Sequence, residues 1–302
     1  MASPFSRRSF LGKTTATAAV AGTAASLHQR LQGAEEKGAL KGRINHSVCK
    51  WCYPKVGLEE FCQASKEIGL TSIDLLQPAD MDVLKPYGLT CAMVGNPEVD
   101  GPDGNKVGGI SRAWNRVEHH EKLVEAYEAQ IDAAAKRGLT NLICFSGNRD
   151  GQDDEVGLKN CAIGLKRLMK RAEEKKIVLT MELLNSKVNH PDYQCDQTAG
   201  GVELCKRIGS DHFKLLYDIY HMQIMEGDVI ATIRSSHPYI SHYHTGGVPG
   251  RNEIDESQEL YYPAIMEAVV ATGFKGFVAQ EFIPKRADVF ASLQQGVEIC
   301  DV

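Results

Sequence analysis

The chain has 302 residues, of which 43% are hydrophobic and 24% are charged, a composition typical of a soluble globular protein. Its formal charge of -5, and the lack of a basic tract with interleaved aromatic residues, argue against nucleic acid as a partner. The first 30 residues hold four basic side chains and no acidic one, so the remainder is more acidic still. An anionic substrate would therefore need a local cation or a metal ion to bind.

The N-terminus predicts an export signal. The sequence SRRSFLGK at residues 6–13 resembles the twin-arginine consensus, and the weakly apolar stretch at 14–25 is too short and too polar for a transmembrane helix. We therefore expect a twin-arginine signal and disordered linker over residues 1–35, the export machinery as a partner, and a periplasmic location. An uncleaved disordered arm is the alternative, and the mature start is expected within residues 25–42.

From Arg43 onward, short β-type runs alternate with amphipathic helical segments. Expected strands cover residues 44–51, 72–76, 89–94, 141–145, 177–182, 213–218, 239–244 and 276–281. Expected helices cover residues 58–68, 81–84, 123–135, 155–174, 199–208, 228–235, 262–271 and 286–299, and residues 96–110 form a long loop. Strict alternation predicts a parallel α/β sheet, and eight repeats predict one closed (β/α)8 TIM barrel over residues 43–302. A doubly wound sheet is the alternative, but no Gly-x-Gly-x-x-Gly turn follows the first strand.

Nine cysteines, an odd number in a long chain, argue against a disulfide scaffold. Cys49 and Cys52 form a Cys-x-x-Cys motif that could suit redox chemistry or zinc. They lie in an expected strand, where positions three apart point to opposite faces, which favours simple packing. Mostly buried free thiols would suit a protein that folds in the reducing cytoplasm before export.

Four expected strands in succession end on residues that commonly bind metals: Glu182, Asp218, His244 and Glu281. The carboxyl ends of barrel strands meet at one mouth, so we expect these four side chains to form a single metal site there. Three carboxylates and an imidazole favour Mn2+ or Mg2+, and Co2+, Zn2+ or Fe2+ would also be accepted.

Three further residues are expected near this mouth. His242 precedes His244 by two positions, so both point into the barrel, with His242 deeper as a supporting or core residue. His221 lies in the loop after Asp218, where it could bind a substrate hydroxyl. Arg251 lies in a Gly-rich loop, and its planar fork matches a substrate carboxylate or oxyanion. A polar residue at a helix entry and a plain surface arginine are the respective alternatives.

Several motifs resemble the sugar isomerase/epimerase barrel superfamily, which is xylose isomerase-like. They are MELLN at 181–185, YDIYHMQ at 217–223 with MEG at 225–227, the His-x-His strand, and PGR at 249–251 followed by EL at 259–260. The chain is most similar to the hydroxypyruvate isomerase branch, over roughly residues 43–300. Two features depart from that branch. Some of its members have Gln where this chain has His244, the residue that ketose 3-epimerases have, and an export signal is unexpected for an enzyme of glyoxylate metabolism.

The resemblance implies roles for the same residues. Glu182 and Glu281 would act as the acid/base pair and as metal ligands, with Asp218 and His244 completing the metal site. His221 and Arg251 would contact substrate.

Together these features predict a metal-dependent isomerase that acts on a small α-hydroxy carbonyl compound. The expected reaction converts hydroxypyruvate to tartronate semialdehyde through an enediolate. The alternatives are a ketose or keto-sugar 3-epimerase, a dehydratase of keto-inositols, and a non-catalytic sugar-binding barrel. Metal-assisted phosphodiester hydrolysis would need more metal ligands and a basic groove. Barrels of this superfamily are often dimers or tetramers, so a homo-oligomer is a further expectation.

Overall fold

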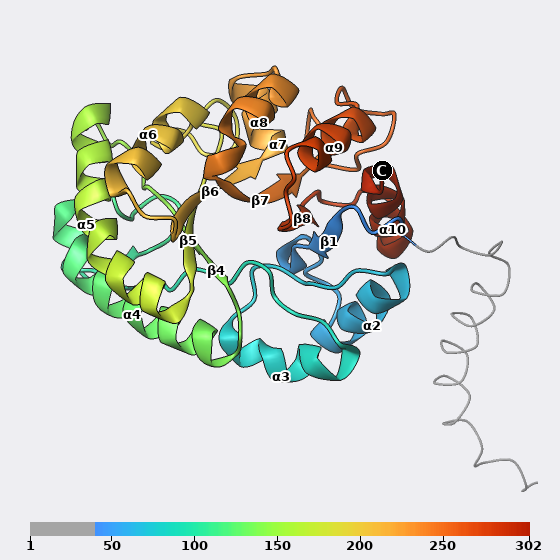
Figure 1. The fold of residues 1–302 in the computed structure, drawn as a ribbon, viewed down its shortest axis with the longest axis horizontal. Helices are drawn as coiled ribbons and strands as arrows, with labels where there is room; N and C mark the ends of the chain where they lie inside the picture. The colour runs from blue at the N-terminus through green and yellow to red at the C-terminus, as the bar shows by residue number, and fades with distance from the viewer. Residues whose placement is uncertain (1–39) are drawn as a thin grey trace, which may run out of the picture. The chain divides into compact units, whose positions relative to one another are not determined.

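A computed structural model describes residues 40–302. The export signal expected at residues 1–35 lies outside the described residues. Within them, six parallel strands form a sheet in the order β1-β8-β7-β6-β5-β4 (Figure 1). These strands are β1 (Asn45–Val48), β4 (Asn141–Cys144), β5 (Val178–Glu182), β6 (Phe213–Asp218), β7 (Ile240–Thr245) and β8 (Phe277–Gln280).

Two irregular segments complete the barrel between β1 and β4, where the sequence predicted regular strands at 72–76 and 89–94. They are joined to their neighbours by isolated parallel bridges: Cys49 to Asp74, Ser72 to Thr90, Leu76 to Val94, and Val94 to Leu142. Leu75 has a φ of +62°, a left-handed conformation that interrupts a strand. The backbone N–H of Ala92 donates to the Ser72 hydroxyl at 2.7 Å, so this donor is not available to a neighbouring strand.

Helices surround the strands (Figure 1). They are α2 (Leu58–Ile68), α3 (Met81–Leu84), α4 (His120–Lys136), α5 (Asp154–Lys175), α6 (Thr198–Ile208), α7 (Ile219–Met225), α8 (Val229–Ser236), α9 (Tyr262–Ala271) and α10 (Val289–Cys300). Local signals explain several of their ends. Gly69, at a φ of +99°, ends α2, and the Asp153 side chain accepts the amides of Glu155 and Val156 at the start of α5.

The parallel sheet and its alternating helices confirm the predicted α/β barrel class. Three further details differ from what the sequence predicted. The first strand stops at Val48, and residues 50–52 form a 3-10 turn, so the Cys-x-x-Cys motif is not in a strand. The loop at 96–110 contains a small hairpin of β2 (Val99–Asp100) and β3 (Lys106–Val107). Helix α7 replaces the loop expected around His221.

All nine cysteines lie in the described part of the chain, and all are buried and free, as expected. Among residues 40–302, no helix is both long and apolar enough to cross a membrane.

Candidate active site

The four predicted ligands converge at the carboxyl ends of β5 to β8. Glu182 and Asp218 close their strands, His244 lies one residue before the end of β7, and Glu281 follows β8 directly. One ligand atom from each residue lies within 4.8 Å of the others, and all four side chains are buried. Asp218 is the register partner of His244, so the parallel ladder itself places these two together. We call Glu182, Asp218 and Glu281 the carboxylate cluster.

His244 turns one ring nitrogen toward the cluster. Its Nδ1 lies 2.8 Å from Glu281 Oε2 and 3.4 Å from Glu182 Oε1. Its Nε2 faces the opposite way, 3.6 Å from Cys49 Sγ and 3.9 Å from Asp74 Oδ2. Nδ1 is therefore the nitrogen that can join the carboxylates as a ligand.

Arg251 reaches the site, but its guanidinium contacts the carboxylate cluster itself. Its Nη2 lies 2.5 Å from Glu281 Oε2 and 3.3 Å from Asp218 Oδ2. The guanidinium also lies near the rings of Trp51 and Tyr220, with centroid distances of 5.1 Å and 5.5 Å. With 9% of its surface exposed, Arg251 is not the plain surface arginine of the alternative interpretation.

His221 lies in α7 with one nitrogen held and the other free. The backbone N–H of Asn185 donates to His221 Nδ1 at 3.1 Å, so the ring proton belongs on Nε2. That Nε2 is buried without a hydrogen-bond partner among residues 40–302, 3.6 Å from Asp218 Oδ2. Burial, together with the charge of Arg251, holds the pKa of His221 well below its usual value. His221 is thus a neutral N–H donor next to the carboxylate cluster.

The pKa values of the two glutamates are shifted in opposite directions by their surroundings. Burial raises the pKa of Glu182, and the nearby Glu281 charge raises it further. Burial acts on Glu281 in the same direction, but Arg251 and His244 outweigh it and hold the pKa of Glu281 well below its usual value. Burial would lower the pKa of His244, but Glu281 and Glu182 raise it well above normal. Carboxyl groups whose pKa values are driven apart are characteristic of acid/base pairs.

Three supporting residues were not found from the sequence. Trp51 donates its indole N–H to Glu281 Oε1 at 2.8 Å, and Asp74 accepts from His242 Nε2 at 2.6 Å. Asn185 orients His221, as described above. Trp51 lies just beyond β1, so the strand-end rule could have found it, whereas Asp74 carries no such signal. His242 has the deeper supporting position that its spacing predicted.

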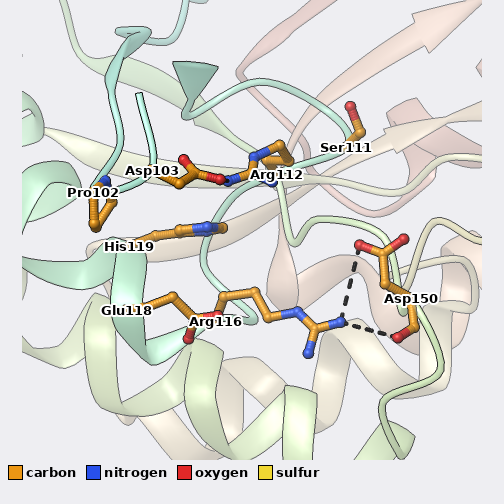
Figure 2. A pocket seen from close by; sticks show the side chains of 8 residues that line it. All are labelled: Pro102, Asp103, Ser111, Arg112, Arg116, Glu118, His119 and Asp150. Atoms are coloured by element: carbon orange, nitrogen blue, oxygen red, sulfur yellow. Dashed lines mark hydrogen bonds and ion pairs between the residues drawn. The ribbon is translucent and has the colours of Figure 1, made fainter. Parts of the chain in front are cut away.

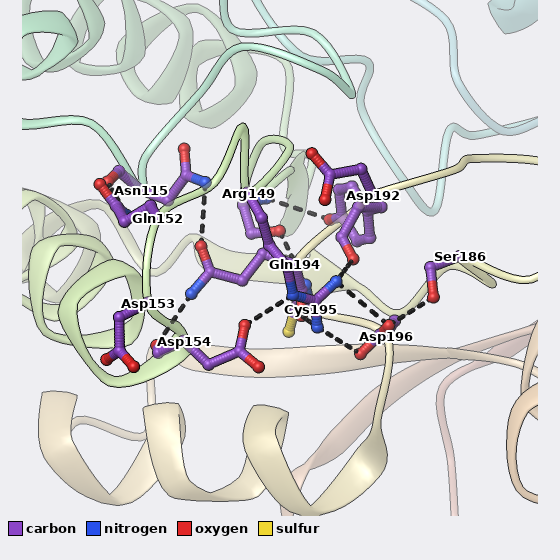
Figure 3. A network of polar contacts seen from close by, with 12 residues as sticks. Asn115, Arg149, Gln152, Asp153, Asp154, Ser186, Asp192, Gln194, Cys195 and Asp196 are labelled. Atoms are coloured by element: carbon purple, nitrogen blue, oxygen red, sulfur yellow. Dashed lines mark hydrogen bonds and ion pairs between the residues drawn. The ribbon is translucent and has the colours of Figure 1, made fainter.

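A polar network joins the loops after β4 and β5 (Figure 3). Arg149 Nη2 lies 3.1 Å from Asp196 Oδ1, and Asp196 Oδ2 accepts the Ser186 hydroxyl at 2.5 Å. Ser186 directly follows Asn185, so this network helps to hold the residue that orients His221. The network therefore supports the site without touching the carboxylate cluster.

A separate cavity of about 400 Å3 lies beside the start of α4 (Figure 2). Its lining residues are Pro102, Asp103, Ser111, Arg112, Arg116, Glu118, His119 and Asp150. Each arginine already faces an acid: Arg112 Nη2 is 2.6 Å from Asp103, and Arg116 Nη2 is 3.9 Å from Asp150 Oδ2. None of the predicted site residues lines this cavity, so it is not part of the site.

Comparison with known proteins gives the family. Residues 62–298 match the xylose isomerase-like TIM barrel family. The chain belongs to this family. It is 24% identical over 247 residues to a putative hydroxypyruvate isomerase from Homo sapiens, covering 78% of this chain and 87% of the relative. It is 32% identical over 141 residues to D-psicose 3-epimerase from Enterocloster bolteae, covering 43% of this chain and 45% of the relative.

A solved structure supports the fold. The AP endonuclease of family 2 from Brucella melitensis superposes with a TM-score of 0.71 at 24% identity, covering 83% of this chain and 97% of that one. At that identity the likeness shows the barrel alone. The names of the sequence relatives, isomerase and epimerase, support an isomerase-type enzyme.

Proposed function

We propose that the chain is a metal-dependent isomerase of a small α-hydroxy carbonyl compound, with hydroxypyruvate converted to tartronate semialdehyde. The observation that carries the proposal is the pair of buried glutamates, Glu182 and Glu281, gathered with Asp218 and His244 within 4.8 Å. A proton moved between adjacent carbons needs carboxyl groups that can accept and return it. The hydroxypyruvate isomerase relative, which the chain matches over most of its length, supports the choice of substrate.

The donor set fits a divalent ion. Three buried carboxylates and the imidazole of His244 offer hard oxygens and one nitrogen, which suits Mn2+ or Mg2+ and also admits Co2+, Zn2+ or Fe2+. Within the described part of the chain, Glu182 Oε1 is buried with no hydrogen-bond partner, because the nearer acceptor of His244 Nδ1 is Glu281. Glu182, Asp218, His244 and Glu281 would hold the ion. A divalent ion there would polarise the substrate carbonyl and stabilise negative charge on its oxygens.

The two glutamates would have different roles in proton transfer. Glu182 has the raised pKa and the free oxygen, so it is suited to take a proton from the carbon beside the carbonyl and keep it. Glu281 stays ionised because Arg251, His244 and Trp51 all direct N–H groups at it. Return of the proton from Glu182 to the neighbouring carbon, with the hydroxyl proton passing to the former carbonyl oxygen, gives the isomer. For an epimer, ionised Glu281 would take the proton on one face, and protonated Glu182 would deliver a proton to the opposite face of the same carbon.

Two residues would orient the substrate. His221 presents its free Nε2–H beside Asp218 and can donate to a substrate oxygen. Arg251, held near Trp51 and Tyr220, keeps a fixed positive charge at the mouth, where it can meet a carboxylate or an oxyanion. Both groups are already in place without substrate, which lowers the entropic cost of binding.

A turnover assay in D2O tests this proposal. Metal-free full-length protein would receive Mn2+ and then hydroxypyruvate, and NMR would follow the products. We expect tartronate semialdehyde, with deuterium at the newly protonated carbon in those turnovers where the proton on Glu182 exchanges with solvent, and no turnover when EDTA is present. Absence of product with Mn2+ would reject hydroxypyruvate, and turnover in metal-free protein would reject the metal site.

A ketose 3-epimerase is the second candidate. The observation that favours it is His244, the residue that ketose 3-epimerases have at this position, together with the D-psicose 3-epimerase relative. The same D2O experiment with D-psicose, D-fructose and D-tagatose distinguishes the two. An epimerase would exchange the C3 hydrogen of these ketoses and leave hydroxypyruvate unchanged.

We also propose that the chain is exported by the twin-arginine route to the periplasm. The support is the twin-arginine sequence with Arg7 and Arg8. Replacing both by Lys should leave the protein in the cytoplasmic fraction of a bacterial host, whereas equal periplasmic amounts of the variant would contradict export by this route. The homo-oligomer stays a prediction, which sedimentation equilibrium would check.

A further inference from the structure

A second buried carboxylate, Asp74, lies behind His244 on the side away from the carboxylate cluster. Asp74 Oδ2 is 2.6 Å from His242 Nε2 and 3.9 Å from His244 Nε2. The second distance is too long for a hydrogen bond, but it is short enough for strong attraction in a dry interior. Asp74 therefore holds His242 firmly and acts electrostatically on the outer nitrogen of His244.

Asp74 is fixed from several sides. It is fully buried, and its Oδ1 accepts the hydroxyls of Ser47 at 2.6 Å and Ser72 at 3.2 Å. Among the described residues, its ion-pair partners are the two histidines, with no lysine or arginine. A buried charge is costly unless it is hydrogen-bonded, so this arrangement of two serines and a histidine is what keeps the carboxylate in the core.

The backbone beside Asp74 is also constrained. Leu75 has a φ of +62°, a conformation that costs energy for a residue with a side chain. The N–H of Asp74 donates to Val48 O at 2.8 Å, and the N–H of Leu75 donates to Met93 O at 2.8 Å. The neighbouring segments thus hold the strained turn, which directs the Asp74 side chain at the two histidines.

We propose that Asp74 is a positioning residue: through His242 and His244 it keeps the Nδ1 atom of His244 turned toward the carboxylate cluster. Metal-binding histidines commonly direct their other nitrogen to a carboxylate, which sets the tautomer and the ring orientation. Asp74 is the carboxylate on that side of His244, and at 3.9 Å from Nε2 it acts by its charge and through its hydrogen bond to His242. The inference rests on the proposed function, because it assigns His244 to a metal site.

The test is metal affinity in Asp74→Asn, which keeps the side-chain volume and removes the charge. Calorimetry of metal-free full-length protein with Mn2+ should show an affinity reduced by about 10- to 100-fold. The visible absorption of the Co2+ form should shift, because the geometry of a ligand has changed. Mn2+ affinity and a Co2+ spectrum both equal to wild type would overturn the inference.

A matched control separates positioning from loss of a buried charge. Asp301 is another aspartate whose side chain is largely buried beside a histidine, with Oδ1 at 3.5 Å from His46 Nε2 near the start of β1. Asp301→Asn should leave Mn2+ affinity and the Co2+ spectrum unchanged, and an equal loss there would overturn the inference. Should Asp74→Asn fail to fold, Ser47→Ala removes one hydrogen bond to Asp74 and should lower Mn2+ affinity several-fold, and an unchanged affinity would overturn the inference.

The remaining outcomes are also decisive. Two Mn2+ ions per chain would overturn the inference, because Asp74 and His242 would then be ligands of a second ion. Wild-type protein that binds no divalent ion would contradict the proposed function and this inference with it. Wild-type binding together with an unaffected Asp74→Asn variant would contradict the inference alone.

Discussion

Strands β5 to β8 and the segment from β1 to residue 94 contribute to the same site in different ways. The first region supplies Glu182, Asp218, His244 and Glu281 from the ends of named parallel strands, paired in ladders that carry one register shift, between Leu215 and Leu216. The segment from β1 to residue 94 is joined partly by isolated bridges. It supplies Trp51 and Asp74, which form hydrogen bonds with Glu281 and His242 of the first region. A regular ladder therefore sets the chemical groups, and irregular backbone sets the contacts that hold them.

The largest effect on turnover is expected in the regular half of the site, which is the region from β5 to β8. Glu182→Gln keeps the size of the side chain but cannot accept a proton, so turnover should fall by about 10²- to 10⁴-fold. Steady-state kinetics with the active substrate measures the loss. Glu174→Gln, an exposed change in α5, is the control and should be silent. Near wild-type turnover in Glu182→Gln would remove this glutamate from the proton transfer.

The contrast between the halves also explains what the sequence could predict. Period-two alternation correctly placed His242 and His244 on one face, and the strand-end rule brought four residues from distant positions within 4.8 Å. The segment at 72–76 could not be read in this way, because Leu75 breaks the alternation with a positive φ that leaves no sequence signal. The role of Asp74 depends on that break.

Other features depend on three-dimensional contacts. Helix α7 begins where the Asp218 side chain accepts the backbone N–H of His221, so a residue expected to bind metal also caps a helix. The contact of Arg251 with Asp218 and Glu281 depends on a loop whose path the sequence does not specify. Sequence predicted which residues meet, and packing decided which of their atoms face each other.

Removing the fixed cation should be the next largest effect. Arg251→Met leaves Glu281 and Asp218 buried without their partner, so the free energy of unfolding of metal-free protein should fall by about 3–5 kcal/mol. Urea unfolding in EDTA measures it. Arg207→Met, at a surface pair with Glu155, should cost far less, because solvent screens that ion pair. Equal losses in the two variants would mean that Arg251 does not balance buried charge.

The stability of metal-free protein should depend on pH. Because the pKa of His244 is raised, its stabilising contribution is complete below its unfolded value of about 6.5 and is lost as pH rises through the folded value. The raised pKa of Glu182 acts in the same direction above its unfolded value of about 4.3. Above about pH 7.5 the lowered pKa of His221, which makes stability rise with pH at lower values, no longer has an effect. Urea unfolding in EDTA from about pH 7.5 to 9 should therefore show falling stability, by up to about 1.4 kcal/mol per pH unit for each group. A flat or rising profile would contradict these shifts.

The smallest effect is expected in the irregular half of the site, which is the segment from β1 to residue 94. Trp51→Phe keeps a ring beside Arg251 but removes the N–H that Glu281 Oε1 accepts, at a partly exposed position. We expect a loss of about 1 kcal/mol in transition-state stabilisation, or roughly five-fold in kcat/KM. Trp114→Phe, buried elsewhere, should leave kcat/KM unchanged. A loss in Trp51→Phe as large as that in Glu182→Gln would mean that the two halves do not differ in role.

The most direct test of the central claim is the position of the bound ion. Crystals of the full-length protein grown with Mn2+, with data collected at the manganese absorption edge, would show that position as an anomalous peak. The account predicts one peak within bonding distance of Glu182, Asp218, His244 and Glu281, with Nδ1 as the His244 ligand atom. A peak elsewhere in the chain, or no peak with Mn2+ in excess, would contradict it.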